Sequence, residues 1–149
     1  MFTLYYVSRR RASALSALLA SVALAASTSI AHAAVGQIKL AALGDDASVT
    51  LFYPTDATEQ KVQRGPFELS LAVDAPPATA RSNGRLVVIS HGSGGHELGH
   101  HNLATRLAAD GYLVAALRHP GDNWEDRSMI TSGRYFSERS ERLGFELRV

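Results

Sequence analysis

The sequence predicts an α/β fold, and three features of residues 86–117 support this prediction. Residues 86–89 (Leu-Val-Val-Ile) form an apolar run without polar alternation, which is typical of a strand covered on both faces of a parallel sheet. Residues 98–110 place apolar side chains on one helical face. Residues 112–117 form a second apolar run. A strand, a helix and a second strand in this order predict a βαβ unit with a right-handed crossover.

A glycine-rich segment joins the first predicted strand to the helix. Three of the four residues 92–95 are glycine, so the chain can turn tightly there without side-chain clashes. Gly111 follows the helix, where a C-terminal stop is expected. Residues 118–132 are predicted to form the loop after the second strand, at the sheet edge where open α/β sheets bind ligands. In this loop, His119 and Trp124 line either the ligand side or the surface.

Two strands are predicted at the start of the fold. Residues 36–43 and 47–53 are rich in β-favouring residues, and the Gly-Asp-Asp segment at 44–46 indicates a hairpin turn between them. Pro54 is expected to end the second strand, because proline cannot donate a hydrogen bond to a neighbouring strand.

The segment before the βαβ unit contains one more predicted strand. Residues 67–73 alternate apolar and polar side chains, which favours a strand at or near the sheet edge. The polar residues 55–65 and 74–84 are expected to be exposed connections. Near the C-terminus, residues 133–141 are expected to begin a helix. The predicted folded domain is residues 34–149.

Residues 1–33 have the pattern of a signal peptide. A basic segment at 9–11 precedes an apolar stretch at 14–26, which is short for a membrane span. Ala31-His32-Ala33 then forms an A-x-A cleavage site, so we expect removal of the peptide after Ala33 and export to the periplasm or medium. The general secretory route is favoured over the twin-arginine route. An uncleaved membrane anchor is the alternative, whereas cleavage would leave no stable anchor.

The composition excludes several classes of protein. The chain has no cysteine, which excludes disulfides, thiolate metal sites, a thiol nucleophile and a lipoprotein anchor. Removing residues 1–33 takes away three of the 15 basic residues and no acid, so 12 basic residues face 14 acidic ones and the net charge is −2. Because no basic stripe is present, nucleic acid is not expected as a partner. The sequence predicts no oligomeric state.

Three segments carry a resemblance to a known superfamily. They are residues 87–95 (VVISHGSGG), His100-His101, and residues 118–124 (RHPGDNW). Together they resemble the first half of an α/β-hydrolase, and they are similar to its dienelactone hydrolase-like and platelet-activating-factor acetylhydrolase-like group. The resemblance covers about residues 45–137. It implies the N-terminal part of an α/β-hydrolase fold, with a mixed, mainly parallel sheet flanked by helices. It also implies an esterase that acts on small-molecule carboxylic esters by serine acylation, without a cofactor.

The resemblance gives a catalytic role to the backbone of the glycine-rich segment. In this superfamily the loop after the corresponding strand supplies one oxyanion-hole N–H group, which here is the backbone N–H of Ser93. His91, Gly92, Gly94 and Gly95 would support this loop, His91 by hydrogen bonding, and the N-terminus of the following helix would add a favourable partial charge. Ser93 is not expected to be the nucleophile, because a G-x-S-x-G elbow would require glycine at position 91.

The nucleophile, acid and base of the superfamily have no matching positions in this sequence. No serine has glycine at both the −2 and +2 positions. We therefore expect that the chain stops before the nucleophile elbow, either as a fragment or through a frameshift that begins an aberrant tail near residue 138. As an esterase, this chain alone is expected to be inactive.

Two other hypotheses remain open. Residues 96–100 (HELGH) match the H-E-x-x-H zinc motif, in which His96 and His100 would bind the metal and Glu97 would act as base. Glu125 is a possible third ligand. This motif normally lies within a helix, and the glycines directly before it disfavour one. A non-catalytic secreted domain is the third hypothesis.

Overall fold

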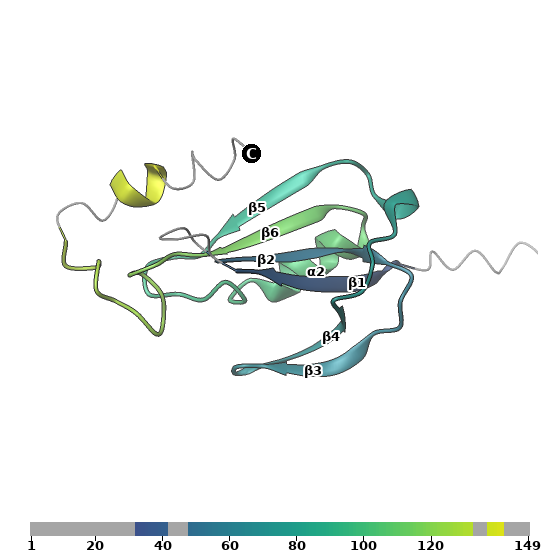
Figure 1. The fold of residues 1–149 in the computed structure, drawn as a ribbon, viewed down its shortest axis with the longest axis horizontal. Coiled ribbons are helices and arrows are strands. Elements are labelled where there is room, and N and C mark those ends of the chain that lie inside the picture. Colours follow the sequence, from purple (N-terminus) through teal and green to yellow (C-terminus); the bar gives the residue numbers. More distant parts are fainter. Residues whose placement is uncertain (1–31, 42–47, 133–136, 142–149) are drawn as a thin grey trace, which may run out of the picture. The chain divides into compact units, whose positions relative to one another are not determined.

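A six-stranded mixed sheet with one helix packed against it forms the core of the fold (Figure 1). The computed structural model describes residues 32–41, 48–132 and 137–141, all within the unit formed by residues 32–149. The strands are β1 (Ala34–Leu40), β2 (Ser48–Thr55), β3 (Gln60–Arg64), β4 (Phe67–Val73), β5 (Leu86–Ser90) and β6 (Leu113–Arg118). The helices are the short η1 (Thr79–Arg81) and α2 (His101–Ala109). Residues 137–141 are also helical.

The strand order is β3-β4-β1-β2-β6-β5, which makes β3 and β5 the two edges of the sheet. β5 pairs parallel with β6, as expected of a βαβ unit, and Ser90 lies opposite Leu117. β1 and β4 are also parallel. The other three pairs in the described residues are antiparallel: β2 runs opposite to both of its neighbours, β1 and β6, and β3 runs opposite to β4. The predicted α/β fold with a mixed sheet is confirmed, although parallel pairing has a smaller share than predicted.

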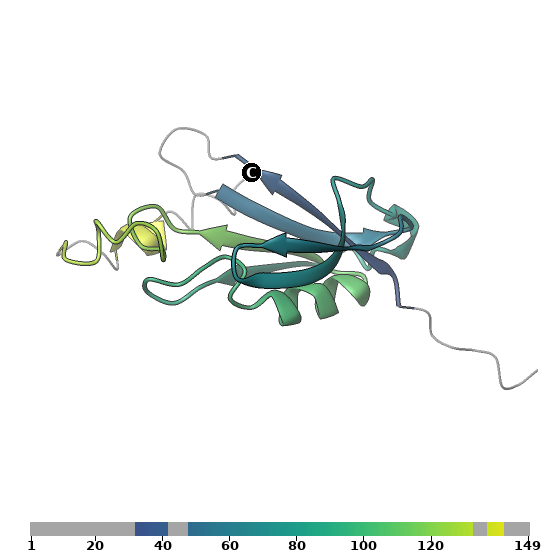
Figure 2. The ribbon, with the colours of Figure 1, turned by 90° about the horizontal axis from the view of Figure 1, so that it is seen from below.

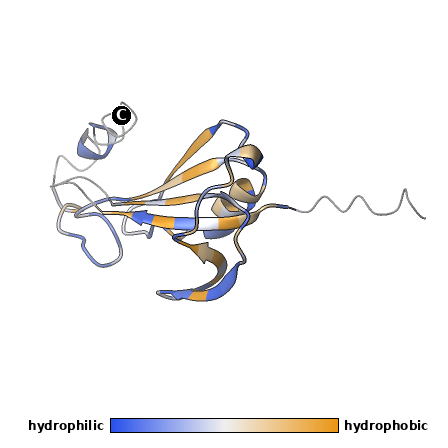
Figure 3. Ribbon diagram, turned by 45° about the vertical axis from the view of Figure 1, so that its right-hand side comes forward, coloured by the Kyte–Doolittle hydropathy of each residue, from blue (hydrophilic) through white to orange (hydrophobic). Residues whose placement is uncertain are grey.

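The hydrophobic core lies between the sheet and α2, which covers one face (Figure 2). Ala104 and Ala108 are the buried helix residues, and their small side chains let α2 approach the sheet closely. Phe52 and Val114 from neighbouring strands are both fully buried in this core. Hydrophobic residues predominate along the central strands, whereas β3 is largely hydrophilic (Figure 3). No helix in the described part of the chain is long and apolar enough to cross a membrane.

The prediction of a loop at residues 55–65 is wrong, because this segment contains β3. β3 forms a hairpin with β4 through Gly65, which has a positive φ of 57°. As an edge strand it exposes most of its polar side chains, and edge strands carry charge in order to avoid pairing with other chains. Its polar sequence therefore fits a strand as well as a loop. β4 pairs with both β3 and β1, so it is not itself an edge strand.

Pro54 does not end β2, which continues to Thr55. The carbonyl of Pro54 accepts a hydrogen bond from the Ala78 N–H at 2.8 Å, so the Pro54 backbone faces away from β1. On that side β2 is no longer paired with β6, since the pairing between these two strands reaches only as far as Phe52 in β2. No strand needs an N–H donor at this position, and proline is tolerated there. The turn predicted at residues 44–46 lies outside the described residues.

The helix predicted at residues 98–110 is shorter in the structure. α2 begins at His101 because residues 97–100 form a turn. Its C-terminal end is as predicted, since Gly111 has a φ of 94°, a conformation that favours glycine. The later start separates the helix N-terminus from the glycine-rich segment, so the partial charge expected there is not adjacent to Ser93.

Candidate active site

The glycine-rich segment, residues 91–95, forms a bend at the carboxyl end of β5. Gly92 and Ser93 are exposed, and the Gly95 N–H donates a hydrogen bond to the Gly92 carbonyl at 3.0 Å. Gly94 has a positive φ of 65°, so glycine is favoured at this point of the turn. The bend therefore presents backbone groups to solvent, next to the end of the neighbouring parallel strand β6.

Asp122 holds this bend in place. Its side chain is 1% exposed, and its Oδ1 atom accepts a hydrogen bond from the Gly94 N–H at 2.7 Å and from the Ser93 hydroxyl at 3.1 Å. The Ser93 backbone N–H, in contrast, has no acceptor among the described residues. The Ser93 amide is thus free to bind a ligand oxygen, while the groups beside it are fixed.

His91 lies beneath the bend and supports it by hydrogen bonding. The side chain is 3% exposed. Its Nε2 atom accepts the backbone N–H of His119 at 3.3 Å, which leaves the ring proton on Nδ1. Nδ1 then donates to the Gly92 carbonyl at 2.8 Å. A neutral imidazole with both nitrogens engaged in this way positions the loop rather than transferring protons.

Ser90 and His119 form a contact that the sequence analysis did not identify. Ser90 is the last residue of β5, and its Oγ atom lies 2.8 Å from Nε2 of His119, the first residue after β6. Ser90 is exposed, whereas His119 is only 2% exposed. The parallel pairing of β5 with β6 brings these two strand ends together. A serine hydroxyl beside a histidine nitrogen is the arrangement used by activated nucleophiles.

Arg139 brings a positive charge to the same group of residues. Its Nη1 atom donates to Oδ2 of Asp122 at 2.7 Å, and its Nη2 atom donates to Ser90 Oγ at 3.2 Å and to the His91 carbonyl. Asp122 therefore binds the bend through one carboxylate oxygen and Arg139 through the other. Arg139 lies in the segment predicted to be an aberrant tail, yet it contacts three parts of this site.

The H-E-x-x-H string does not have the geometry of a zinc motif. His100 is the N-cap of α2, with φ −114° and ψ 29°, so the string precedes the helix instead of lying within it. The two histidines are consequently not one helical turn apart on the same face. Within the described ranges, no three His, Asp or Glu side chains come together as a metal-binding group. The zinc hypothesis lacks the structure that it requires.

His96 instead packs beside the bend. Its ring stacks on Trp124 with a centroid distance of 5.7 Å, and Nδ1 accepts the Leu98 N–H at 2.9 Å. Burial lowers the pKa of His96, while the Glu97 carboxylate opposes this shift and the Arg118 guanidinium adds to it. His96 is therefore a neutral hydrogen-bond acceptor that fixes the chain before α2.

A cavity of about 500 Å³ lies next to His96 and Trp124. Glu97 lines it and is 6% exposed, with Lys39 Nζ at 3.9 Å and Arg118 Nη1 at 4.0 Å from the carboxylate. Trp124 connects this cavity to the bend, because its backbone N–H donates to the Gly95 carbonyl at 2.9 Å. A buried carboxylate with two cations close to it is thus part of the wall beside the candidate active site.

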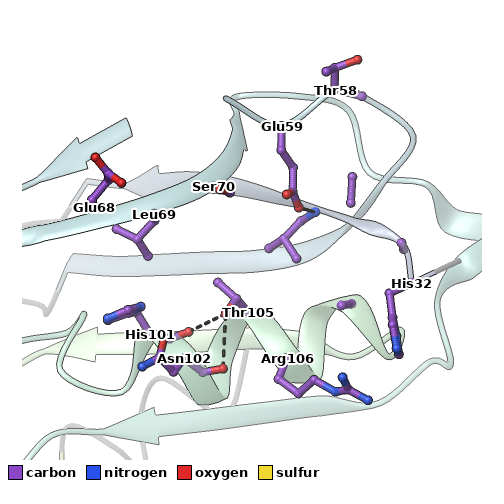
Figure 4. Close-up of a pocket in the computed structure, with 15 residues that line it drawn as sticks. His32, Thr58, Glu59, Glu68, Leu69, Ser70, His101, Asn102, Thr105 and Arg106 are labelled. Atoms are coloured by element: carbon purple, nitrogen blue, oxygen red, sulfur yellow. Dashed lines mark hydrogen bonds between the residues drawn. The ribbon is translucent and has the colours of Figure 1, made fainter. Parts of the chain in front are cut away.

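A larger cavity of about 780 Å³ lies between α2 and β4 (Figure 4). His101, Thr105 and Arg106 line it from the helix side. The Thr105 hydroxyl donates a hydrogen bond to the His101 carbonyl of the same helix at 2.9 Å, and it is therefore not directed at a ligand. None of the residues of the bend lines this cavity.

The comparisons with known proteins support the fold. No family model matches the chain, and no curated protein matches it. Among solved structures, a ferulic acid esterase from Streptomyces cinnamoneus is similar, with 22% sequence identity and a TM-score of 0.50. The match covers 64% of this chain and 36% of the esterase chain, so the chain spans about a third of that protein. At this identity the likeness shows the fold alone, a partial α/β fold like that of an esterase.

Proposed function

We propose that this chain carries the oxyanion-loop part of a serine-type carboxylic ester hydrolase of the dienelactone hydrolase-like group. The observation that carries the proposal is the backbone N–H of the exposed residue Ser93, which has no acceptor among the described residues and lies between groups that are already hydrogen-bonded. The fold that it shares with a ferulic acid esterase supports an ester as substrate class. A complete form would act on small-molecule esters and would need no cofactor.

The proposed role of Ser93 follows from the chemistry of acyl transfer. Attack on an ester carbonyl places negative charge on the carbonyl oxygen, and a backbone N–H fixed beforehand can bind that charge without reorganising. One such donor contributes about 2.7–4 kcal/mol to the transition state. Asp122 fixes the bend before any substrate arrives, because it binds both the Ser93 hydroxyl and the Gly94 N–H.

The elbow serine, acid and base would come from a complete form of the protein. These 149 residues contain no G-x-S-x-G motif, so rapid turnover of esters is not expected from this chain alone. The proposal therefore concerns the binding of the oxyanion, which can be tested on the chain as it is.

We also propose that the protein is exported after cleavage behind Ala33. The start of β1 at Ala34, directly after the predicted cleavage site, supports this proposal, because cleavage there would leave the strand intact. N-terminal sequencing of protein recovered from the periplasm and medium tests it. A first residue well inside β1, or recovery only of uncleaved chain, would contradict export by this route.

Titration with butylphosphonate, an anion with the charge and shape of the tetrahedral intermediate, tests the oxyanion proposal. In ¹⁵N–¹H spectra we expect the Ser93 amide to shift the most. Ser93→Pro removes the N–H and should abolish binding, whereas Ser93→Ala keeps the N–H and should still bind. Shifts that avoid residues 91–95, or equal binding by Ser93→Pro, would refute the proposal.

A further inference from the structure

We propose that Ser90 is itself a nucleophile, activated by His119 as general base, so that activated acyl donors bound at the bend acylate Ser90. This inference rests on the proposed function, because it uses the bend to hold the acyl group. It adds a reactive serine that is not in an elbow motif, at the end of the strand that precedes the bend.

The geometry fits a nucleophile and its base. The 2.8 Å between Ser90 Oγ and His119 Nε2 is within the range over which a general base removes a proton. Ser90 is exposed and can meet a substrate, whereas His119 lies behind it and is 2% exposed. A buried base beside an exposed hydroxyl leaves the oxygen, and not the nitrogen, accessible to an acyl donor.

His119 is held firmly in this position. Its backbone N–H donates to His91 Nε2 at 3.3 Å, and its carbonyl accepts the Asn123 side-chain amide at 2.8 Å. The His119 and His91 rings meet edge to face with centroids 4.9 Å apart. Since the backbone and the ring are both fixed, the imidazole needs little reorganisation to accept a proton from Ser90.

The charges around Ser90 favour its reactive form. Arg139 Nη2 lies 3.2 Å from Ser90 Oγ, and this guanidinium stabilises negative charge on that oxygen. Asp122 balances the charge of Arg139 at 2.7 Å and also binds the Ser93 hydroxyl at 3.1 Å. One hydrogen-bonded network therefore joins the proposed nucleophile, the cation beside it and the bend with the free amide.

The reaction is an acyl transfer to Ser90. Ser90 Oγ forms a bond to the carbonyl carbon while its proton passes to Nε2 of His119. The bond from that carbon to the leaving oxygen then breaks, and His119 returns the proton to the departing alcohol. The product is an ester of Ser90, which water hydrolyses by the same steps in reverse. Because Ser90 lies at an exposed strand end, small acyl groups on good leaving groups are the expected donors.

A fluorophosphonate probe tests this inference on the full chain. Ser90 Oγ forms a bond to phosphorus, the bond to fluorine breaks, and the proton leaves as hydrogen fluoride by way of His119. Trypsin cuts after Arg85 and Arg106, so one peptide contains both Ser90 and Ser93, and fragment spectra must locate the label. We expect the label on Ser90.

Variants separate a reactive serine from a merely accessible one. Ser90→Ala should abolish labelling, and His119→Gln should slow it by about 100-fold or more, the usual contribution of a general base. Ser70→Ala removes an exposed strand serine elsewhere and should label as wild type does. If His119→Gln does not fold, the location of the label in the wild-type protein and the loss in Ser90→Ala still decide the matter.

The outcomes distinguish this inference from the proposed function. No label, or label only on another residue, overturns the role of Ser90 even if the Ser93 amide responds to butylphosphonate. Label on Ser90 with a silent Ser93 amide supports the nucleophile and refutes the oxyanion donor. Unchanged labelling in a folded His119→Gln variant overturns the role of His119 as base.

Discussion

Replacing Asp122 by asparagine should loosen the bend and destabilise the fold. The wild-type carboxylate accepts hydrogen bonds from the Gly94 N–H and the Ser93 hydroxyl through one oxygen and from Arg139 through the other. Asparagine has nearly the same shape but only one acceptor oxygen and no charge. The substitution therefore keeps at most one side of the network and removes the counter-ion of Arg139.

The structure gives the size of this effect. Asp122 is 1% exposed and the Arg139 side chain 17%, so the ion pair is shielded from solvent. Removing one partner of a buried pair costs about 3–5 kcal/mol. Because asparagine keeps one hydrogen bond, we expect a loss near the lower end, about 3 kcal/mol in the free energy of unfolding. For a domain of this size that corresponds to a fall in Tm of about 10 °C.

Thermal and urea denaturation followed by circular dichroism measure this loss. Asp126→Asn is the matched control, because Asp126 lies in the same loop and accepts two backbone N–H groups, yet is exposed. We expect the control to change stability much less. A Tm of Asp122→Asn within about 2 °C of wild type, or an equal loss in Asp126→Asn, would refute the reasoning.

Three further predictions concern the rest of the fold. Gly111→Ala should destabilise the protein by more than 1 kcal/mol in urea denaturation, since a Cβ there lies 2.7 Å from a backbone oxygen; Gly84→Ala, with a similar φ but open space, should cost less. The folded pKa of His96 is lowered, so as the pH falls below about 6.5 the His96 side chain takes up a proton in the unfolded chain before it does so in the folded one, and stability should fall on acidification; His96→Asn should flatten this fall. Removing residues 1–33 deletes the exposed contact between His32 and Asp110, so the Tm of the shortened chain should be nearly unchanged; a large loss would contradict cleavage at that site.

The sequence predicted the central strands well because their signal is local. β4 matches the predicted bounds of residues 67–73, and β5 and β6 differ from the predictions by one residue at their ends. An apolar run reports burial on both faces of a sheet wherever it pairs. β3 was missed because an exposed edge strand is polar, as a loop is, and its pairing with β4 is not visible in composition.

The network around Ser90 could not be read from the same patterns. Ser90 and His119 are 29 positions apart, and their contact depends on the parallel register of β5 and β6. The available signal was that polar residues, Ser90 in one case and Arg118 and His119 in the other, follow two apolar runs predicted to be parallel neighbours. Asp122 and Arg139 gave less indication, since their role depends on how the loop after β6 and the helical residues 137–141 lie against the bend.

A structure of the protein with bound butylphosphonate tests the central claim most directly. The claim is that the bend after β5 offers the Ser93 N–H to a developing oxyanion. We predict a phosphonate oxygen about 2.7–3.1 Å from the Ser93 nitrogen, with Asp122 still bound to the Gly94 N–H. A phosphonate bound elsewhere, or a bend whose Ser93 amide is turned into the protein, would contradict it.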